Sequence, residues 1–150
     1  MPPLHHVLQR LSVMAAALWW GGLSVVGFLS VPLLFMSLPT AQAGQVAAKL
    51  FTAMAWLSVA CGMLLVFLLK PARAGDGAQA SGTGAAAPVP LAWSGWALAG
   101  VVLALLVEFG IAPRILAREN LALWHNLATA LYALQWLCAA VLLWRLGGRR

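Results

Sequence analysis

The sequence predicts an all-α membrane protein, a four-transmembrane-helix bundle made of two antiparallel hairpins. Of its 150 residues, 63% are hydrophobic and only 8% are charged, whereas a soluble domain carries about 25% charged residues. The chain contains four apolar runs, each of about 20 residues or more, which is enough to cross a hydrocarbon core ~30 Å thick. The runs are continuously apolar, which excludes the alternating pattern of membrane β-strands.

The predicted helices span residues 11–36, 43–69, 93–112 and 121–146 within a single membrane domain, 1–150. The first run is too long for the apolar part of a signal peptide, so we expect it to remain as a helix. Short turns at 37–40 and 118–120 join the helices into two antiparallel hairpins. Residues 70–92 are rich in Gly, Ala and Pro, which predicts a flexible cytoplasmic loop between the hairpins. Small residues spaced by four, at Ala17/Gly21, Ser58/Gly62 and Gly100/Ala104, allow close helix approach.

The basic residues predict the orientation of the chain. Lys and Arg concentrate in cytoplasmic segments, and here they lie at the ends of apolar runs rather than along one face, which argues against nucleic-acid binding. We therefore expect both termini on the cytoplasmic side of a bacterial inner membrane, with lipid as the main partner. The terminal side would hold Arg10, Lys70, Arg73, Arg145, Arg149 and Arg150, and the opposite side Lys49, Arg114 and Arg118.

Polar residues within the spans predict an outer-side cluster, because such groups usually face the bundle or a cavity. Lys49, Glu108 and His125 lie at similar depths on three helices, and each shares a helical face that suits the interior. A structural ion pair, or snorkelling of Lys49 to the headgroups, is the alternative interpretation. Arg114 and Asn126 would lie near this cluster, and its pocket would be lined by Thr129, Tyr132, Trp56 and Trp136.

Metal binding has two candidate sites. Glu108 and His125 could hold an ion, or Cys61, Cys138 and Met63 could form a soft site suited to copper, although buried cysteines more often only pack. A b-type haem needs two axial ligands, and only one histidine lies within a span, so haem is disfavoured. We predict no cofactor, with copper or another metal ion as the alternative.

No hydrolase, nucleotide-binding or zinc-protease motif is present, which argues against an enzyme. The first functional hypothesis is a small inner-membrane protein that handles a metal ion or small solute, or confers tolerance to it, through the polar cluster. The rival is a non-catalytic accessory or assembly subunit of a larger membrane complex, and a haem or redox subunit comes third. Because four short helices enclose little space, we also expect a homo-oligomer or a larger assembly.

Several short stretches resemble a known family. The stretches are Leu18–Gly22 followed by Phe28–Phe35 with Pro32, Ala43–Val46 with Lys49–Phe51, Ala112–Arg114, and His125–Asn126. They resemble motifs of a bacterial membrane family of unknown function, which is related to the eukaryotic transmembrane protein 205 group. The resemblance implies a four-helix membrane module without an established activity. The eukaryotic group is associated with platinum-drug tolerance, which implies transport or metal handling. The Trp-Trp-Gly-Gly stretch also resembles copper-resistance D-type membrane domains, and Glu108 has no counterpart in these motifs.

Overall fold

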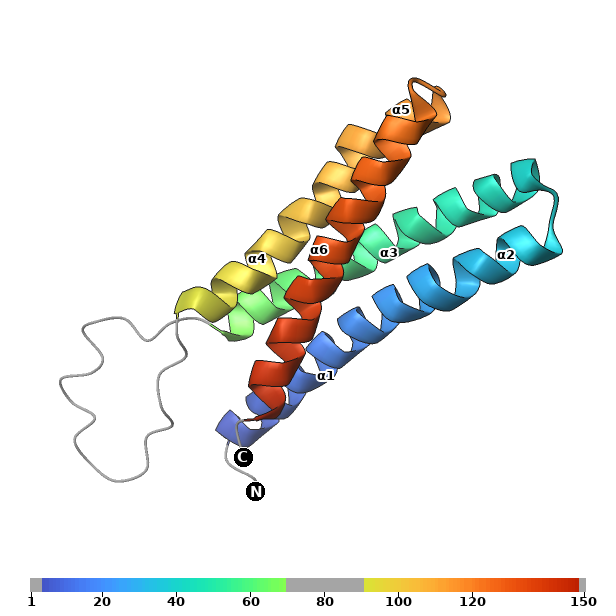
Figure 1. The fold of residues 1–150 in the computed structure, drawn as a ribbon. Helices are drawn as coiled ribbons and strands as arrows, with labels where there is room; N and C mark the ends of the chain where they lie inside the picture. Colours follow the sequence, from blue (N-terminus) through green and yellow to red (C-terminus); the bar gives the residue numbers. More distant parts are fainter. Residues whose placement is uncertain (1–3, 70–90, 149–150) are drawn as a thin grey trace, which may run out of the picture.

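The protein is a bundle of four long helices, confirming the predicted fold class (Figure 1). The computed structural model describes residues 4–69 and 91–148, and these residues contain no strand. The first helix comprises α1 (Leu4–Ser24), the π-helical segment η1 (Val25–Ser30) and α2 (Val31–Ser37), and the second is α3 (Thr40–Leu68). The third comprises α4 (Leu91–Leu105), the π-helical segment η3 (Leu106–Ile111) and α5 (Ala112–Leu116), and the fourth is α6 (Leu121–Gly147).

The helix ends differ most from the predicted ones at two places. The first helix begins at Leu4 rather than near residue 11, and the third continues through Pro113 to Leu116 rather than ending near residue 112. Each of the two prolines, Pro32 and Pro113, stands at the start of a short α-helical segment that follows a π-helical one. The predicted loop over 70–92 lies outside the described residues, apart from Leu91 and Ala92, which are helical.

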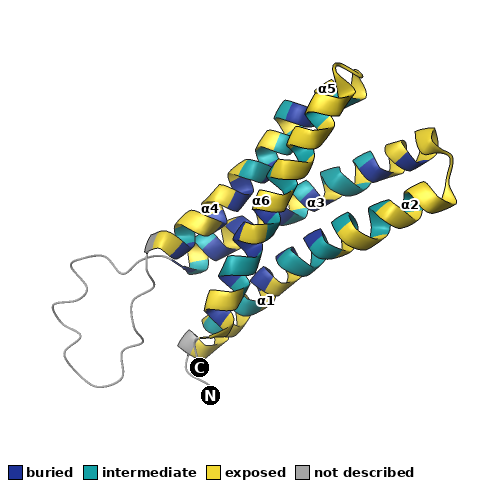
Figure 2. Cartoon of the chain, viewed as in Figure 1, coloured by how far each residue is buried: buried dark blue, intermediate teal, exposed yellow. Residues whose placement is uncertain are grey.

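The four helices pack as a ring. Within the hairpins α1 packs on α3 and α4 on α6, and between the hairpins α1 packs on α6 and α3 on α4. The described ends of α1 and α6 lie at the same end of the bundle, and the two hairpins diverge toward their turns (Figure 1). Burial follows this shape, since α2 and α5 contain no buried residue and the turn ends are largely exposed (Figure 2).

Glycines allow the closest approach in the core. A Cβ on Gly100 would lie 2.5 Å from Cη2 of Trp19, and one on Gly62 would lie 2.3 Å from Cγ2 of Val101. Both distances are below any real contact, so only glycine fits between these helices. Ser58/Gly62 and Gly100/Ala104 therefore face the bundle, as their spacing indicated. The pair Ala17/Gly21 does not, because Ala17 is exposed and a Cβ on Gly21 would meet nothing within 4 Å.

The π-helical segments have a common cause in the sequence. Pro32 and Pro113 lack the N–H group that a helix needs, and their rings press on the carbonyl four residues earlier. In each case the residue before the proline donates its N–H five residues back, from Val31 to Val26 and from Ala112 to Val107. The wider turn moves the obstructed carbonyls aside, and such turns recur at functional sites.

Candidate functional site

Glu108 lies in the middle of the π-helical segment η3, where its side chain is half-buried. The hydroxyl of Thr52, on α3, donates a hydrogen bond of 2.9 Å to its Oε1 atom. This bond links the two hairpins, because α3 belongs to the first and η3 to the second. A neutral hydroxyl is thus the hydrogen-bond partner of this intramembrane carboxylate.

The carboxylate borders a small pocket between the hairpins. Its volume is about 20 Å³, which is enough for a single water molecule. The lining segments of α3 and α6 lie near the middle of these helices. The wall combines apolar side chains with three polar ones, and consists of Leu23, Phe51, Met54, Ala55, Ala104, Val107, Glu108, Tyr132 and Gln135.

Two further hydrogen bonds tie α6 to the first hairpin around this pocket. The amide nitrogen of Gln135 donates to Oγ of Ser58 at 2.7 Å, and both residues are buried. Ser58 in turn donates to the carbonyl of Met54 at 2.7 Å. The Tyr132 hydroxyl donates to the carbonyl of Leu23 at 2.8 Å. These bonds satisfy polar groups that would otherwise be unpaired in the bundle.

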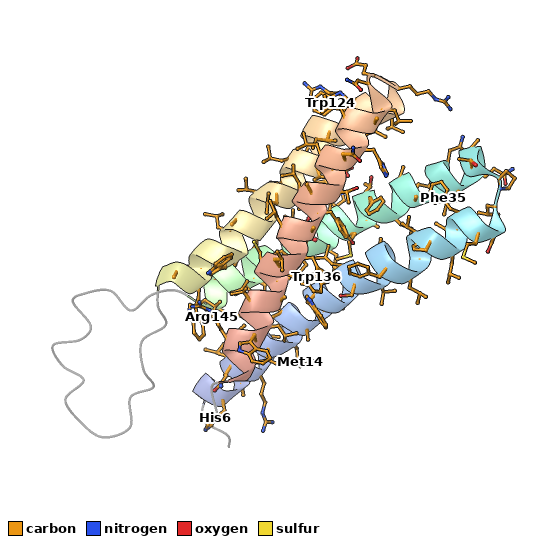
Figure 3. The ribbon with its side chains drawn as sticks, in the orientation of Figure 1. His6, Met14, Phe35, Trp124, Trp136 and Arg145 are labelled. Atoms are coloured by element: carbon orange, nitrogen blue, oxygen red, sulfur yellow. The ribbon has the colours of Figure 1, made fainter. Side chains whose placement is uncertain are left out.

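Aromatic rings close one side of this region. Tyr132 meets Phe51 edge to face, with ring centroids 5.4 Å apart. Trp136 projects from the middle of α6 (Figure 3) and packs between Trp20 and Phe28 of the first hairpin. Its indole N–H donates to Oγ of Ser24 at 2.8 Å. Trp136 therefore joins the hairpins beside the pocket without lining it.

The structure does not assemble the predicted cluster of Lys49, Glu108 and His125. No hydrogen bond or ion pair joins Glu108 to either basic residue within the described ranges, and both Lys49 and His125 are exposed. Lys49 does share a face with Trp56, as its spacing indicated, but that face is turned outward. His125 lies in the first two turns of α6, well before Gln135, the first buried residue of that helix.

The other residues assigned to this cluster lie at the turn end of the second hairpin. The Arg114 guanidinium stacks over the Trp124 ring, 4.5 Å from its centroid, and donates to the carbonyl of Gly110. Trp124 lies near the turn between α5 and α6 (Figure 3). Asn126 is exposed. Arg114 therefore caps the end of the hairpin rather than facing Glu108.

Of the four residues predicted to line a pocket, only Tyr132 does so. Thr129 is exposed and its hydroxyl donates to the carbonyl of His125 on its own helix. Trp56 is 56% exposed and meets Phe109 on the outer surface of the bundle, with ring centroids 6.3 Å apart. The prediction failed for Trp56 and Thr129 because the sequence does not show which face of each helix points inward.

The residues of the two candidate metal sites differ in burial. Cys61 and Cys138 are buried and free, and Met63 is on the exposed side of α3. Across residues 4–69 and 91–148 no three His, Cys, Asp or Glu side chains are grouped to hold a metal ion. The polar side chains at the pocket offer oxygen atoms from Glu108, Tyr132 and Gln135, a donor type that suits hard cations better than copper.

Sequence reasoning missed several residues that build the site. Three of them, Gln135, Ser58 and Thr52, are polar residues near the middle of a span. Their position alone indicated an inward-facing role, because exposing a polar group to lipid costs free energy. Phe51 and Met54 are apolar residues in apolar helices, so nothing in the sequence distinguishes them. Their role comes only from the packing of α3 against α6 around the pocket.

Comparison with known proteins and protein families places the chain in a family. No curated protein and no solved structure matches it. A family model described as "Domain of unknown function (DUF4149)" matches residues 14–122, a range that includes Thr52 and Glu108 and ends before Tyr132. Since the matched range covers more than half of the 150 residues, this four-helix membrane protein belongs to the DUF4149 family.

Proposed function

We propose that this small integral membrane protein handles a small cation, either a metal ion or a cationic solute, at the pocket beside Glu108. One observation carries the proposal: a half-buried carboxylate borders a pocket between the hairpins, and its hydrogen-bond partner is the neutral Thr52. Ionisable residues inside membranes are rare, and they commonly mark ion or solute pathways.

Energetics favour a positively charged ligand. A charged side chain near the centre of a membrane helix costs about 3 kcal/mol by insertion measurements. A hydrogen bond to a charged group contributes about 1.5–3 kcal/mol, so the Thr52 hydroxyl offsets about half of that penalty or more when the carboxylate is ionised. A cation in the pocket would offset the remainder, and the basic residues Lys49 and His125 do not take this role.

The setting of the proposal is a bacterial inner membrane with both termini in the cytoplasm. Arg145 lies at the terminal end of α6 and Trp124 at the opposite end (Figure 3), with Arg114 and Arg118 near the turn. The distribution of basic residues over the whole sequence supports this orientation. The resemblance to the transmembrane protein 205 group, with its association with platinum-drug tolerance, adds weight to cation handling.

The test is cation binding by the purified protein and by two charge variants. Glu108→Gln removes the carboxylate at the pocket, and Glu119→Gln removes the same charge at the exposed turn. Equilibrium dialysis against Na⁺, K⁺, Zn²⁺ and Cu⁺, one at a time, should find at least one bound ion. Its affinity should fall roughly tenfold to hundredfold in Glu108→Gln, as expected for the loss of a charged ligand, and stay unchanged in Glu119→Gln.

Two results would contradict the proposal. In one, none of the four ions binds to the wild-type protein. In the other, an ion binds equally well to wild type and Glu108→Gln. If the native mass spectrum of the same preparation then showed a fixed ratio to a larger membrane complex, the protein would instead be an accessory subunit. The divergent outer halves, where α2 and α5 bury no residue, leave surface for such a partner.

A further inference from the structure

The two hairpins share a pattern that is hidden in the sequence and visible in the structure. Each has a first helix with a six-residue π-helical segment, followed after one residue by a proline, then a turn and a long second helix. A shift of 81 residues (113 − 32 = 81) superposes Pro32 on Pro113. The same shift superposes the start of η1 on that of η3, and the start of α3, Thr40, on that of α6, Leu121.

Burial repeats under the same shift. Ala16 and Ala97 are both fully buried. Leu65 is also fully buried, and Leu146 has an exposed fraction of 2%. Trp19 and Gly100, which are equivalent positions, contact each other across the bundle, because the tryptophan ring occupies the space in front of the glycine. Further equivalent pairs in which both members are buried are Ser12/Trp93, Leu23/Ala104, Met54/Gln135, Ser58/Ala139 and Cys61/Leu142.

The packing of the helices obeys a two-fold relation. If α1 exchanges with α4 and α3 with α6, the contact of α1 with α3 becomes that of α4 with α6. The contact of α1 with α6 likewise becomes that of α3 with α4. All four contacts are present, and they form the ring of the bundle (Figure 1). Both hairpins run in the same direction, so the relating axis lies along the membrane normal, as in parallel repeats of transporters.

The pocket beside Glu108 lies on this axis. Six of its lining residues form three equivalent pairs, Leu23 with Ala104, Phe51 with Tyr132, and Met54 with Gln135. Residues that meet their own equivalents around one space must surround the axis that relates them. Phe51 and Tyr132 show this directly, because their rings touch edge to face.

The two sides of the axis differ in chemistry. The second hairpin contributes Glu108, Tyr132 and Gln135, where the first has Gly27, Phe51 and Met54. Gly27 occupies the position equivalent to Glu108 and also points across the axis, since its Cβ would lie 2.9 Å from Cε1 of Tyr132. The first hairpin therefore forms an apolar wall, and the second supplies the polar groups.

We infer that the chain is a tandem repeat of one helical hairpin, and that its pocket holds a single monovalent, oxygen-preferring cation on the pseudo-two-fold axis, between the two repeats. The ligand part of this inference rests on the proposed function. The volume of about 20 Å³ admits one water-sized ion. Mg²⁺ keeps several of its water molecules, and Ca²⁺ needs roughly six to eight oxygen ligands. A pocket of this volume has room for neither arrangement.

The repeat is tested without any ligand by exchanging a hydrogen bond across the axis. The four-residue variant Met54→Gln, Ser58→Ala, Gln135→Met, Ala139→Ser moves the amide–hydroxyl pair to the equivalent positions. Its melting temperature in detergent should stay within about 3 °C of wild type. The partial variant Met54→Gln, Gln135→Met, which lacks the matching hydroxyl, should melt clearly lower. Equal destabilisation of both variants would overturn the two-fold relation.

The axial position of the ligand is tested by moving the carboxylate. NaCl and KCl should each be titrated against N-methylglucamine chloride at constant ionic strength, with the melting temperature as the readout. Glu108→Gly should lose the Na⁺- or K⁺-dependent increase, and Gly27→Glu with Glu108→Gly should regain it. The control Val26→Glu with Glu108→Gly should not regain it, because Val26 faces another direction on the helix than Gly27, whose Cβ would point at the pocket residue Tyr132.

A second relocated carboxylate covers the case in which the Gly27→Glu variant does not fold. Gly27 is tightly packed against Tyr132, so if Gly27→Glu with Glu108→Gly fails to fold, Leu23→Glu with Glu108→Ala places a carboxylate on the same wall and should regain the response. A response lost in Glu108→Gly and regained in neither relocated variant would overturn the axial site. If Glu108→Gly kept the full Na⁺- or K⁺-dependent increase in melting temperature, the proposed function would be overturned instead. The melting temperatures of the hydrogen-bond exchange variants would still show whether the two hairpins are repeats.

Discussion

Glu108 and Gly27 contribute different chemistry to the site from the same position of the two hairpins. They are equivalent in the two hairpins, and both lie in a π-helical segment. Glycine lets Tyr132 approach the backbone of the first helix, while the glutamate reaches α3 and accepts a bond from Thr52. At this position the first hairpin therefore presents only its backbone, while the second presents a carboxylate.

Close packing at Gly100 predicts a sharp stability effect. In Gly100→Ala the new methyl group would lie 2.5 Å from Cη2 of Trp19, which is fully buried and cannot move into open space. Overpacking of this kind costs about 1–3 kcal/mol. The free energy of unfolding, measured by mixed-micelle denaturation, should fall by that amount.

Gly95 provides the matched control on the same helix. A Cβ there would meet nothing within 4 Å, so Gly95→Ala should leave stability unchanged or raise it slightly through better helix propensity. If Gly100→Ala were as stable as Gly95→Ala, α1 and α4 would not approach each other as closely as described.

The prolines act on whole helices rather than on single contacts. Pro32 and Pro113 each follow a π-helical segment and widen the turn before them. A π-helical turn holds one more residue than an α-helical turn. The side chains after it are therefore rotated about the helix axis relative to those before it. Glu108 sits inside such a turn, and its direction toward Thr52 depends on it.

Replacement of Pro113 should therefore disturb the site from a distance. Pro113→Ala restores an N–H group that can bond to the carbonyl of Phe109, which favours a regular α-turn and rotates Glu108 away from α3. We expect cation affinity to fall roughly tenfold or more, by equilibrium dialysis, while the helix content measured by circular dichroism stays the same.

Pro39→Ala is the control for this change. Pro39 precedes α3 in the exposed turn of the first hairpin, outside both π-helical segments. Its carbonyl accepts a bond from the N–H of Ala43, and alanine preserves that carbonyl. Unchanged affinity in both proline variants would show that the π-helical turn does not position Glu108.

The shape of the molecule sets which parts of the helices can act together. The hairpins are in contact near the middle and at the terminal end, and they diverge toward the turns (Figures 1 and 2). Buried residues of α6 begin at Gln135 and continue to Leu146. The pocket lies where divergence begins, so a ligand would reach it from the turn side, which is the outer side in the proposed orientation.

Orientation is open to a direct measurement. Fusions of green fluorescent protein after Arg150 and within residues 75–85 should both fluoresce, and alkaline phosphatase at the same sites should be inactive. Both results follow from the excess of Lys and Arg on that side of the membrane. A fusion in the turn near Glu119 should give the opposite pattern, and active phosphatase after Arg150 would reverse the proposed orientation.

The sequence alone was enough for the four spans and their pairing into hairpins. Continuous apolar runs and short turns permit little else, because lipid requires every backbone group to be bonded within its own helix. It also singled out Glu108 as an intramembrane carboxylate. It also predicted that Lys49 and His125 lie on helical faces suited to the interior.

Only the tertiary structure decided which of those faces meet. Lys49 lies on the outward face of α3, and His125 is exposed in the first two turns of α6, before its first buried residue. Glu108 instead meets Thr52, and Gln135 meets Ser58, across the interface between the two hairpins. Periodicity within one helix cannot show the rotation, crossing or divergence of its neighbours, because these depend on glycine contacts and on proline-widened turns acting across the whole bundle.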